Sequence, residues 1–170
     1  MPLGVDAAQG LTHAQLGRWG PPASIFAKKK GQVMIKWLVL GVIGITVGVA
    51  VYVRLAPTEP SRWHEMPSAV TNRDLTGGAM RVVGAGDGGL ARMDEIIRDT
   101  PRTEVLAGSV ESGMVTYVTR SKVFGFPDYT TVRAAGPQLE LYGRLRFGKS
   151  DMGVNAARLD RWLKAFAERG

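Results

Sequence analysis

The most continuous hydrophobic pattern in the chain is the run WLVLGVIGITVGVAVYV, residues 37–53, which contains no charged residue. As an α-helix this run spans about 25 Å, at the short end for crossing a bilayer, and residues 33–35 can extend it. Basic and aromatic residues stand at both ends, and amphipathic rings favour the level of the lipid headgroups. We therefore predict a transmembrane anchor over residues 34–55, flanked by Lys36, Trp37, Tyr52 and Arg54.

Beyond a proline-rich neck, residues 56–79, the pattern changes to short segments typical of a globular domain. Apolar residues recur at helical spacing from Leu90, with Asp87 as the expected N-cap of this first helix. A second helix is expected to begin at Asn155. The apolar stripe of the second helix consists of Leu159, Trp162, Leu163 and Phe166. Strands are expected over residues 81–83, 103–107, 114–122, 129–134 and 138–147. Short turns between the last four strands favour antiparallel pairing. We predict an α+β domain over residues 80–170, a small antiparallel sheet with two helices in the order β-α-β-β-β-β-α.

Residues 84–89, GAGDGG, match the G-x-G-x-x-G pattern of dinucleotide-binding folds. That fold needs repeated β-α-β units and a parallel sheet, and only the first unit here could qualify. Glu111 lies at a suitable distance along the chain for a ribose-binding acid, but it falls in an expected hairpin turn. We interpret these glycines as a flexible turn into a helix and expect no cofactor.

The formal charge of +7 is unevenly distributed. Five basic residues and one acidic residue precede Trp37, whereas the remainder has 17 basic and 14 acidic residues. Lysines before the anchor predict a cytoplasmic N-terminus, with residues 57–170 outside the cytoplasm at a bacterial inner membrane, in the periplasm. The mixed charges of the outer domain argue against a nucleic-acid partner. A signal peptide cut near Gly48 or Ala50 is the competing interpretation.

Residues 1–33 are rich in glycine, proline and lysine, and we expect an unstructured cytoplasmic segment there. Met34 is an alternative start, which would make residues 1–33 an over-extended reading frame. Within the anchor, Gly44 and Gly48 form a G-x-x-x-G pattern, which permits two helices to approach closely. We therefore keep the pairing of two transmembrane helices through Gly44 and Gly48 as a possible interaction of the anchor.

The amino-acid composition offers few candidate catalytic residues. The chain has no cysteine, which excludes disulfides, thiolate metal sites and a cysteine nucleophile. Its two histidines, His13 and His64, lie far apart in sequence, so a histidine-based metal site or a triad would depend on His64 alone. We predict no catalytic, cofactor-binding or metal-binding residues.

A basic face is the strongest candidate for binding. In residues 139–147, alternation sends Leu139, Leu141, Leu145 and Phe147 to one face of the strand. Arg144 and Arg146 go to the other face with Glu140 and Tyr142, and Arg120 and Arg133 are expected to join them from neighbouring strands. Forked guanidinium groups suit an anionic headgroup or an acidic partner. Alternatively, this face is solvated, with Glu140 and Asp128 as ion-pair partners.

The segment YGRLRFGKSDMGVNAARLDRWL, with RTEVLAGS, YVTRSKVFGFPDYTTV and the neck, resembles the bacterial DUF1499 family of uncharacterised domains. The resemblance runs from about Tyr52 to Ala167 and implies a membrane-attached member without an established activity. Gly143-Arg144-Leu145-Arg146 replaces the R-S-x-S-R of many members, and the cysteines of some members are absent.

The most specific part of the resemblance is Ser150-Asp151-Met152-Gly153-Val154-Asn155. We expect Ser150, Gly153 and Asn155 to form the start of the last helix, with Asp151 or Asn155 accepting hydrogen bonds from its first free amides. The alternative makes Asp151 a partner of Arg144 or Arg146 at the rim of a pocket.

We predict a non-enzymatic binding or accessory module, with a membrane-protein complex or an anionic envelope ligand as partner. The alternative function is an envelope hydrolase. It would need Ser121, Asp128, Asp151 or His64 to converge in a cleft.

Overall fold

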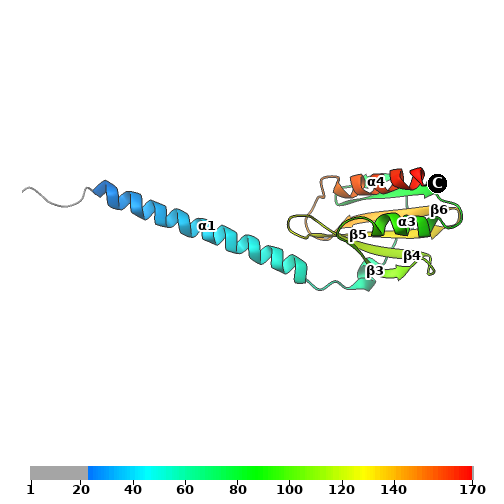
Figure 1. Cartoon of the computed structure of the whole chain (residues 1–170), viewed down its shortest axis with the longest axis horizontal. Coiled ribbons are helices and arrows are strands. Elements are labelled where there is room, and N and C mark those ends of the chain that lie inside the picture. The colour runs from blue at the N-terminus through cyan, green and yellow to red at the C-terminus, as the bar shows by residue number, and fades with distance from the viewer. Residues whose placement is uncertain (1–22, 170) are drawn as a thin grey trace, which may run out of the picture. The chain divides into compact units, whose positions relative to one another are not determined.

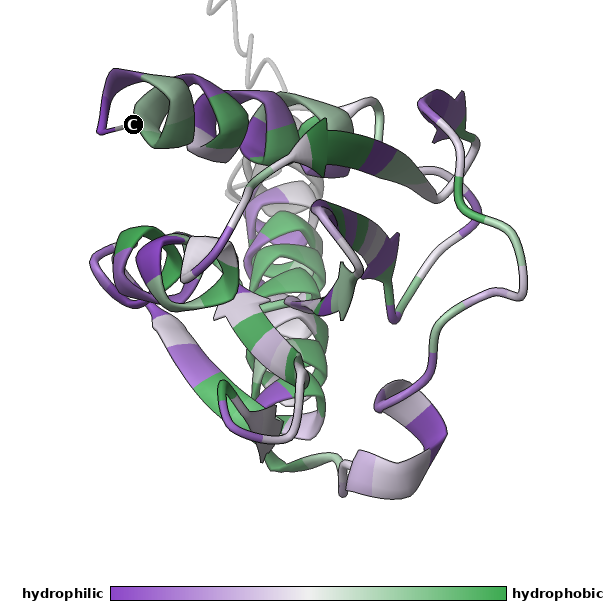
Figure 2. Ribbon diagram, turned by 90° about the vertical axis from the view of Figure 1, so that its right-hand side faces the viewer, coloured by the Kyte–Doolittle hydropathy of each residue, from purple (hydrophilic) through white to green (hydrophobic). Residues whose placement is uncertain are grey.

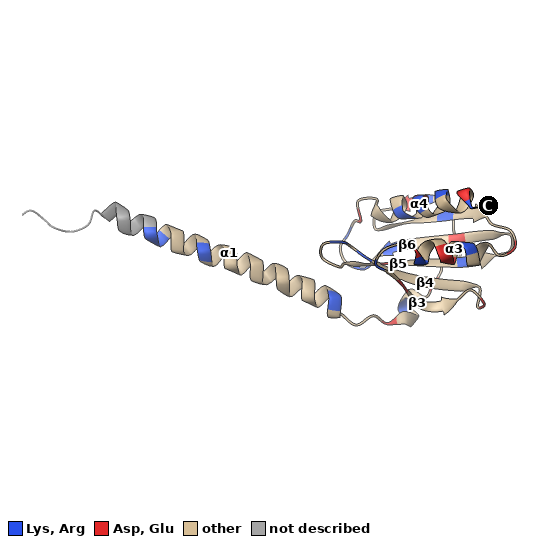
Figure 3. Ribbon diagram, viewed as in Figure 1, with Lys and Arg blue, Asp and Glu red and all other residues tan. Residues whose placement is uncertain are grey.

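The computed structural model describes residues 23–169, which divide into two units at Gly44/Ile45. Helix α1, Ala23–Leu55, contains one stretch, Lys29–Leu55, that is long and apolar enough to cross a membrane. A membrane anchor and a signal sequence both meet this description. Hydrophobic residues dominate this stretch (Figure 2), and blue bands flank its long uncharged part (Figure 3).

Helix α1 begins earlier than the sequence pattern predicts. Residues 23–33, expected to be unstructured, are helical. The glycine and lysines of this segment are compatible with a helix because straight-chain lysine has good helix propensity and one glycine costs only about 1 kcal/mol. The rest of the predicted unstructured segment, residues 1–22, lies outside the described residues.

The described part of the globular unit contains a six-stranded antiparallel sheet, in the order β1-β2-β6-β5-β4-β3. Its strands are β1 Arg73–Leu75, β2 Gly78–Gly84, β3 Thr103–Ser109, β4 Met114–Arg120, β5 Pro127–Ala135 and β6 Gln138–Leu145. The four strands from β3 to β6 form a meander, as their short connections predict. The antiparallel α+β fold is therefore confirmed (Figure 1).

Helices α3, Gly89–Arg98, and α4, Val154–Glu168, lie side by side on one face of this sheet. The predicted stripe of α4 is in the core: Leu159, Trp162 and Phe166 are buried, and Leu163 packs against them. Leu139 and Leu141 of β6 are buried beneath the helices, as their alternation predicts.

Two elements were missed by the sequence pattern. The edge strand β1 has three residues, and Arg73 and Asp74 are exposed, so no alternation marks it. A four-residue helix, α2 Pro60–Trp63, lies in the neck. The prediction of Asp87 as an N-cap is wrong, because α3 starts after Gly88 in a left-handed conformation and has no side-chain cap.

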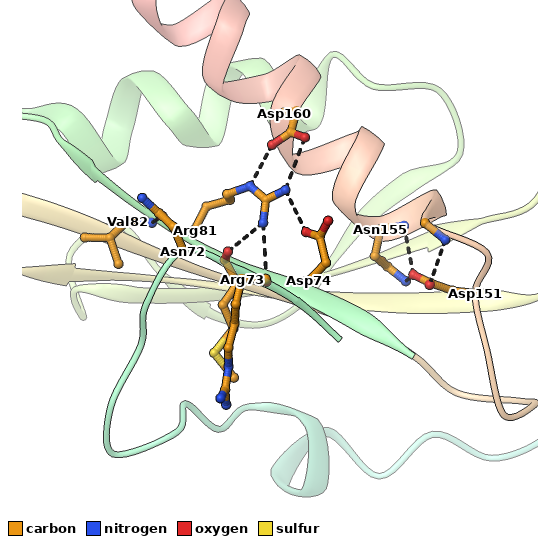
Figure 4. A network of polar contacts seen from close by, with 10 residues as sticks. Asn72, Arg73, Asp74, Arg81, Val82, Asp151, Asn155 and Asp160 are labelled. Atoms are coloured by element: carbon orange, nitrogen blue, oxygen red, sulfur yellow. Dashed lines mark hydrogen bonds and ion pairs between the residues drawn. The ribbon is translucent and has the colours of Figure 1, made fainter. Parts of the chain in front are cut away.

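The Arg81 guanidinium joins α4 to the edge of the sheet (Figure 4). It donates to both carboxylate oxygens of Asp160 on α4 and lies 2.8 Å from Asp74 on β1. Only 15% of the Arg81 side chain is exposed, and its pKa is raised, chiefly by the hydrogen bond to Asp160. This ion pair therefore helps to hold α4 on the sheet.

Candidate functional site

The face of the sheet opposite the helices carries the predicted basic residues. Across β5 and β6, Tyr129 pairs with Arg144, Thr131 with Tyr142, and Arg133 with Glu140. Because paired residues point to the same face, the predicted alternation is confirmed for residues 139–144, whereas Arg146 and Phe147 lie beyond the end of β6 at Leu145. We call the surface formed by Tyr129, Thr131, Arg133, Glu140, Tyr142 and Arg144 the outer face.

The neck lies across this outer face. The Trp63 ring stacks on Tyr129 with the ring centroids 4.0 Å apart and 23° between the ring planes. The Tyr129 hydroxyl is 3.0 Å from that of Thr58, and the Thr131 hydroxyl donates to the Trp63 carbonyl at 3.2 Å. The neck is thus part of the folded domain, although the sequence pattern places the domain start at residue 80.

Two predicted arginines hold the neck in place. Arg146 donates to the carbonyl oxygens of Ala56 and Pro57 and to the hydroxyls of Thr58 and Tyr129. Arg144 donates to the carbonyl oxygens of Trp63 and Glu65. These two side chains therefore have a structural role, and their anion-binding role stays a prediction.

Arg144 is half-buried and close to two aromatic rings. Its guanidinium carbon is 4.5 Å from the Tyr142 ring centroid and 5.5 Å from that of Trp63. Burial lowers its pKa, while Tyr142 and Glu65 act in the opposite direction. Among the ion pairs of the described residues, none includes Arg144. Its hydrogen-bond partners among the described residues are backbone carbonyls, and its charge also faces the two aromatic rings and the nearby Glu65 carboxylate.

Shallow pockets flank Trp63. One, of about 250 Å³, is lined by Arg62, Trp63, Glu65, Met66, Pro67, Tyr142 and Arg144. The other, of about 300 Å³, is lined by Pro57, Glu59, Arg62, Trp63, Arg146 and Phe147. Each pocket combines an aromatic wall with arginines from the sheet and the neck. Arg62 lines both, and its guanidinium lies 5.9 Å from the centroid of the Trp63 ring.

The other two predicted arginines lie apart from these pockets. Arg133 forms an ion pair with Glu140, as the solvated-face alternative predicts. Arg120 donates to the Gly125 carbonyl in the loop that follows its strand. Asp128, the other expected ion-pair partner, instead pairs with Arg158 on the helix side of the sheet.

Asp151 belongs to the start of α4. Its carboxylate accepts hydrogen bonds from the backbone amides of Gly153 and Asn155 and from the Asn155 side chain (Figure 4). Burial acts to raise the pKa of Asp151, but these hydrogen bonds outweigh it, so that the pKa is lowered. The geometry therefore favours the helix-start interpretation of Asp151 over a pairing with Arg144 or Arg146.

The remaining helix-start residues complete this arrangement. Gly153 adopts a left-handed conformation with φ +79°, and the Ser150 hydroxyl accepts a hydrogen bond from the Met152 amide. Buried Asn155 accepts a hydrogen bond from Arg158, which reaches across to Asp128 at 2.8 Å. Burial raises the pKa of Asp128, while the contact with Arg158 lowers it in part.

The four residues of the hydrolase alternative lie at three separate places, with only Asp128 and Asp151 brought together. Asp128 and Asp151 belong to the network beneath α4, whereas His64 Nδ1 is 2.9 Å from the Thr116 hydroxyl on the outer face. The Ser121 hydroxyl accepts a hydrogen bond from the Phe126 amide within a surface loop. No group of three or more metal-binding side chains occurs among the described residues.

The glycine loop has a structural explanation. Strands β2 and β3, on either side of α3, are separated in the sheet by β6, β5 and β4. They therefore form no crevice between adjacent parallel strands, which a dinucleotide fingerprint requires. The Ala85 and Gly86 amides donate to the Pro137 carbonyl at 2.9 and 3.4 Å. The rejection of the fingerprint as a fold signature is confirmed.

The sequence did not mark Thr58, Arg62 and Trp63 as site residues, and the tertiary structure brings them to the outer face. Their signal was limited to aromatic and basic residues in a proline-rich segment, which is typical of any linker. Only the fold of the neck onto β5 and β6 reveals their role.

The search of curated proteins and the search of solved structures each found no match. The comparison with protein families found one whose members are described as proteins of unknown function, and its model matches residues 54–166. The match includes the neck, the whole sheet, all of α3, and α4 as far as Phe166. The chain therefore belongs to the DUF1499 family.

Proposed function

We propose that this is a single-pass protein of the bacterial inner membrane, with its globular domain outside the cytoplasm. The lysines at 28–30 and 36 precede the apolar stretch, and the positive-inside rule supports this orientation. The apolar side chains of α1 are largely exposed, as a lipid-facing helix requires.

We further propose that the domain is a non-enzymatic binding or accessory module for an acidic group of a membrane-protein partner. The observation that carries this proposal is Arg144, a half-buried guanidinium that lines a pocket, donates to two backbone carbonyls and is in none of the ion pairs of the described residues. Removing a cation from water is costly unless an anion compensates it. A carboxylate beside Arg144 and Arg62 would provide that compensation.

The aromatic walls make the pocket selective for a planar acidic group. Trp63 and Tyr142 both line the pocket beside the guanidinium, with ring centroids 5.5 and 4.5 Å from its central carbon. A carboxylate can accept two parallel N–H groups from such a fork. Glu65 also lines the pocket, so an incoming carboxylate must reach Arg144 and Arg62 against the repulsion of this side chain.

The hydrolase alternative has less support. Catalysis by a serine or a carboxylate requires the participating groups to lie within hydrogen-bond reach of one substrate atom. Asp128 and Asp151 already serve buried contacts beneath α4, on the face opposite His64.

Arg62 offers the sharpest test because it lines both pockets and is exposed. We expect Arg62→Ala to leave the unfolding midpoint unchanged and to weaken co-purification of the partner from detergent-solubilised membranes. Arg161→Ala, which removes an equally exposed charge from α4, is the matched control and should retain the partner. Equal recovery with both variants would contradict the proposed site. Hydrolysis of an envelope ester by the purified full chain would instead support the hydrolase alternative.

A further inference from the structure

The loop between β4 and β5, residues 121–126, carries exposed apolar side chains. Val123 is 70% exposed and Phe124 is 41% exposed. These values are unusual for adjacent large apolar residues at a loop tip, where polar and turn-forming residues are the norm. Neither the core nor the pockets beside Trp63 involve these two side chains.

Aromatic rings connect this tip to the last turns of α1. Phe124 contacts Phe126 with ring centroids 5.9 Å apart, and Phe126 contacts Phe147 at 6.2 Å. Phe147 in turn contacts Tyr52 at 6.3 Å. We call the set of Tyr52, Val123, Phe124, Phe126 and Phe147 the aromatic edge. All five residues belong to the unit Ile45–Gly170.

Basic groups accompany the aromatic edge. Lys122 is exposed beside Val123, and Arg146 lies 4.9 Å from the centroid of the Phe147 ring. A Cβ atom at Gly125 would lie 2.9 Å from Nε of Arg54, so the loop backbone runs directly beside Arg54. Apolar and aromatic side chains next to cations are the composition that favours the interface of an anionic bilayer.

The position of Tyr52 sets the depth of this edge. Tyr52 is near the end of the membrane-crossing stretch, where its ring is expected at the headgroup level. The headgroup layer on each side of a bilayer is only about 5–7 Å thick. The 6.3 Å between the Tyr52 and Phe147 rings is about one layer thickness and keeps Phe147 near the lipid surface, and Phe126 follows by one further ring contact of 6.2 Å.

We propose that Val123 and Phe124 insert into the outer interface of the bilayer that holds α1, as a second membrane contact of the domain. This inference rests on the proposed function only in requiring that α1 is retained as an anchor. Two side chains bury too little area to hold the protein on a membrane alone, so their role is to orient the domain on its anchor.

The absence of cysteine from the chain permits a direct test. The full chain with Val123→Cys is labelled with the fluorophore NBD and reconstituted in vesicles of phosphatidylethanolamine and phosphatidylglycerol. The matched control is Glu111→Cys, an exposed turn position at the opposite end of β4. We expect blue-shifted emission and strong quenching by nitroxide-labelled lipids at residue 123, and water-like emission without such quenching at residue 111.

Two results would overturn the inference, and they differ in what they say about the proposed function. Release of the chain from cell membranes by a carbonate wash would show that α1 is not an anchor and would overturn both proposals. Retention of the chain with water-like emission at both labelled positions would overturn only the membrane contact. Strong lipid quenching at both positions would also overturn it, since the whole domain would then lie on the lipid without a preferred edge.

Discussion

The Asp151 carboxylate accepts hydrogen bonds from backbone amides at the start of α4, which have no carbonyl partner within the helix. It accepts hydrogen bonds from the amides of Gly153 and Asn155, and only 8% of the residue is exposed. Helix starts without such a partner leave amides unsatisfied. The contact also holds Asn155 in position to accept a hydrogen bond from Arg158.

We expect stability to depend on the ionisation of Asp151. Because its folded pKa is lowered, its stabilisation is present above the unfolded pKa of about 3.9 and is lost as the pH falls through the lower folded value. Asp151→Asn should lower the free energy of unfolding at pH 7 by about 1–3 kcal/mol and flatten its pH dependence below about pH 4. Urea titrations of both proteins from pH 7 to pH 2 measure this. Parallel pH profiles would contradict the assignment.

Gly86 and Gly78 are glycines for different structural reasons. Gly86 has φ +60° with open space around it, whereas Gly78 lies on β2 against the backbone of β6. A Cβ at Gly78 would overlap the Gly143 carbonyl oxygen, so the two strands would have to separate. Close approach of the backbones, rather than a positive φ, explains the second glycine.

Alanine at these positions should therefore have unequal effects. We expect Gly86→Ala to lower the free energy of unfolding by about 1 kcal/mol, from backbone strain alone. Gly78→Ala should cost more, because an overlap with backbone cannot be relieved by a rotamer change. Thermal unfolding of the full chain in detergent compares them. A smaller loss for Gly78→Ala than for Gly86→Ala would refute the packing argument.

At the scale of elements, the neck is held on the sheet by stacking and by guanidinium–carbonyl contacts. Trp63 stacks on Tyr129, and Arg144 and Arg146 together contact residues from 56 to 65. Hydrogen bonds from charged donors are worth about 1.5–3 kcal/mol each. The arginine pair is therefore a structural clamp as well as a candidate binding surface.

We expect the double change Arg144→Ala plus Arg146→Ala to loosen the neck. Amide hydrogen exchange should increase in residues 58–66, and the free energy of unfolding should fall by about 2 kcal/mol or more. Arg133→Ala is the matched control on the same face, since it breaks only the pair with Glu140, worth about 0–1 kcal/mol. Unchanged exchange in the double variant would show that the neck is held without the arginines, by the stacking of Trp63 and the hydrogen bonds of Thr58 and Thr131.

Periodicity identified the longer elements because their apolar residues face one core. The α4 stripe and the alternation of β6 are of this kind, and both are confirmed. β1 and α2 escaped detection because each is short and is held by neighbours rather than by its own pattern. The start of α3 was misplaced because Asp87 fits the N-cap preference, whereas Gly88 occupies that position.

At the scale of the whole molecule, the anchor and the domain predict a defined topology. We expect protease added to spheroplasts to digest residues 57–170 and to leave the membrane-embedded segment intact, because lysines precede the apolar stretch. A C-terminal tag followed by immunoblotting measures this, with a cytoplasmic protein as the control for lysis. Protection of the domain in intact spheroplasts, with digestion after lysis, would reverse the orientation.

The sequence by itself determined the membrane-compatible helix, the antiparallel α+β class and the outward direction of Arg144 on β6. Each is a local property: continuous apolarity, short connections, or strict alternation along one strand. Whether Arg144 and Arg146 are free could not be read from sequence, because their partners are carbonyls of a neck about 80–90 residues earlier in the chain. Only the tertiary structure brings that neck onto β5 and β6, creates the pockets beside Trp63 and places Asp128 and Asp151 beneath α4, because contacts between distant segments have no periodic signature.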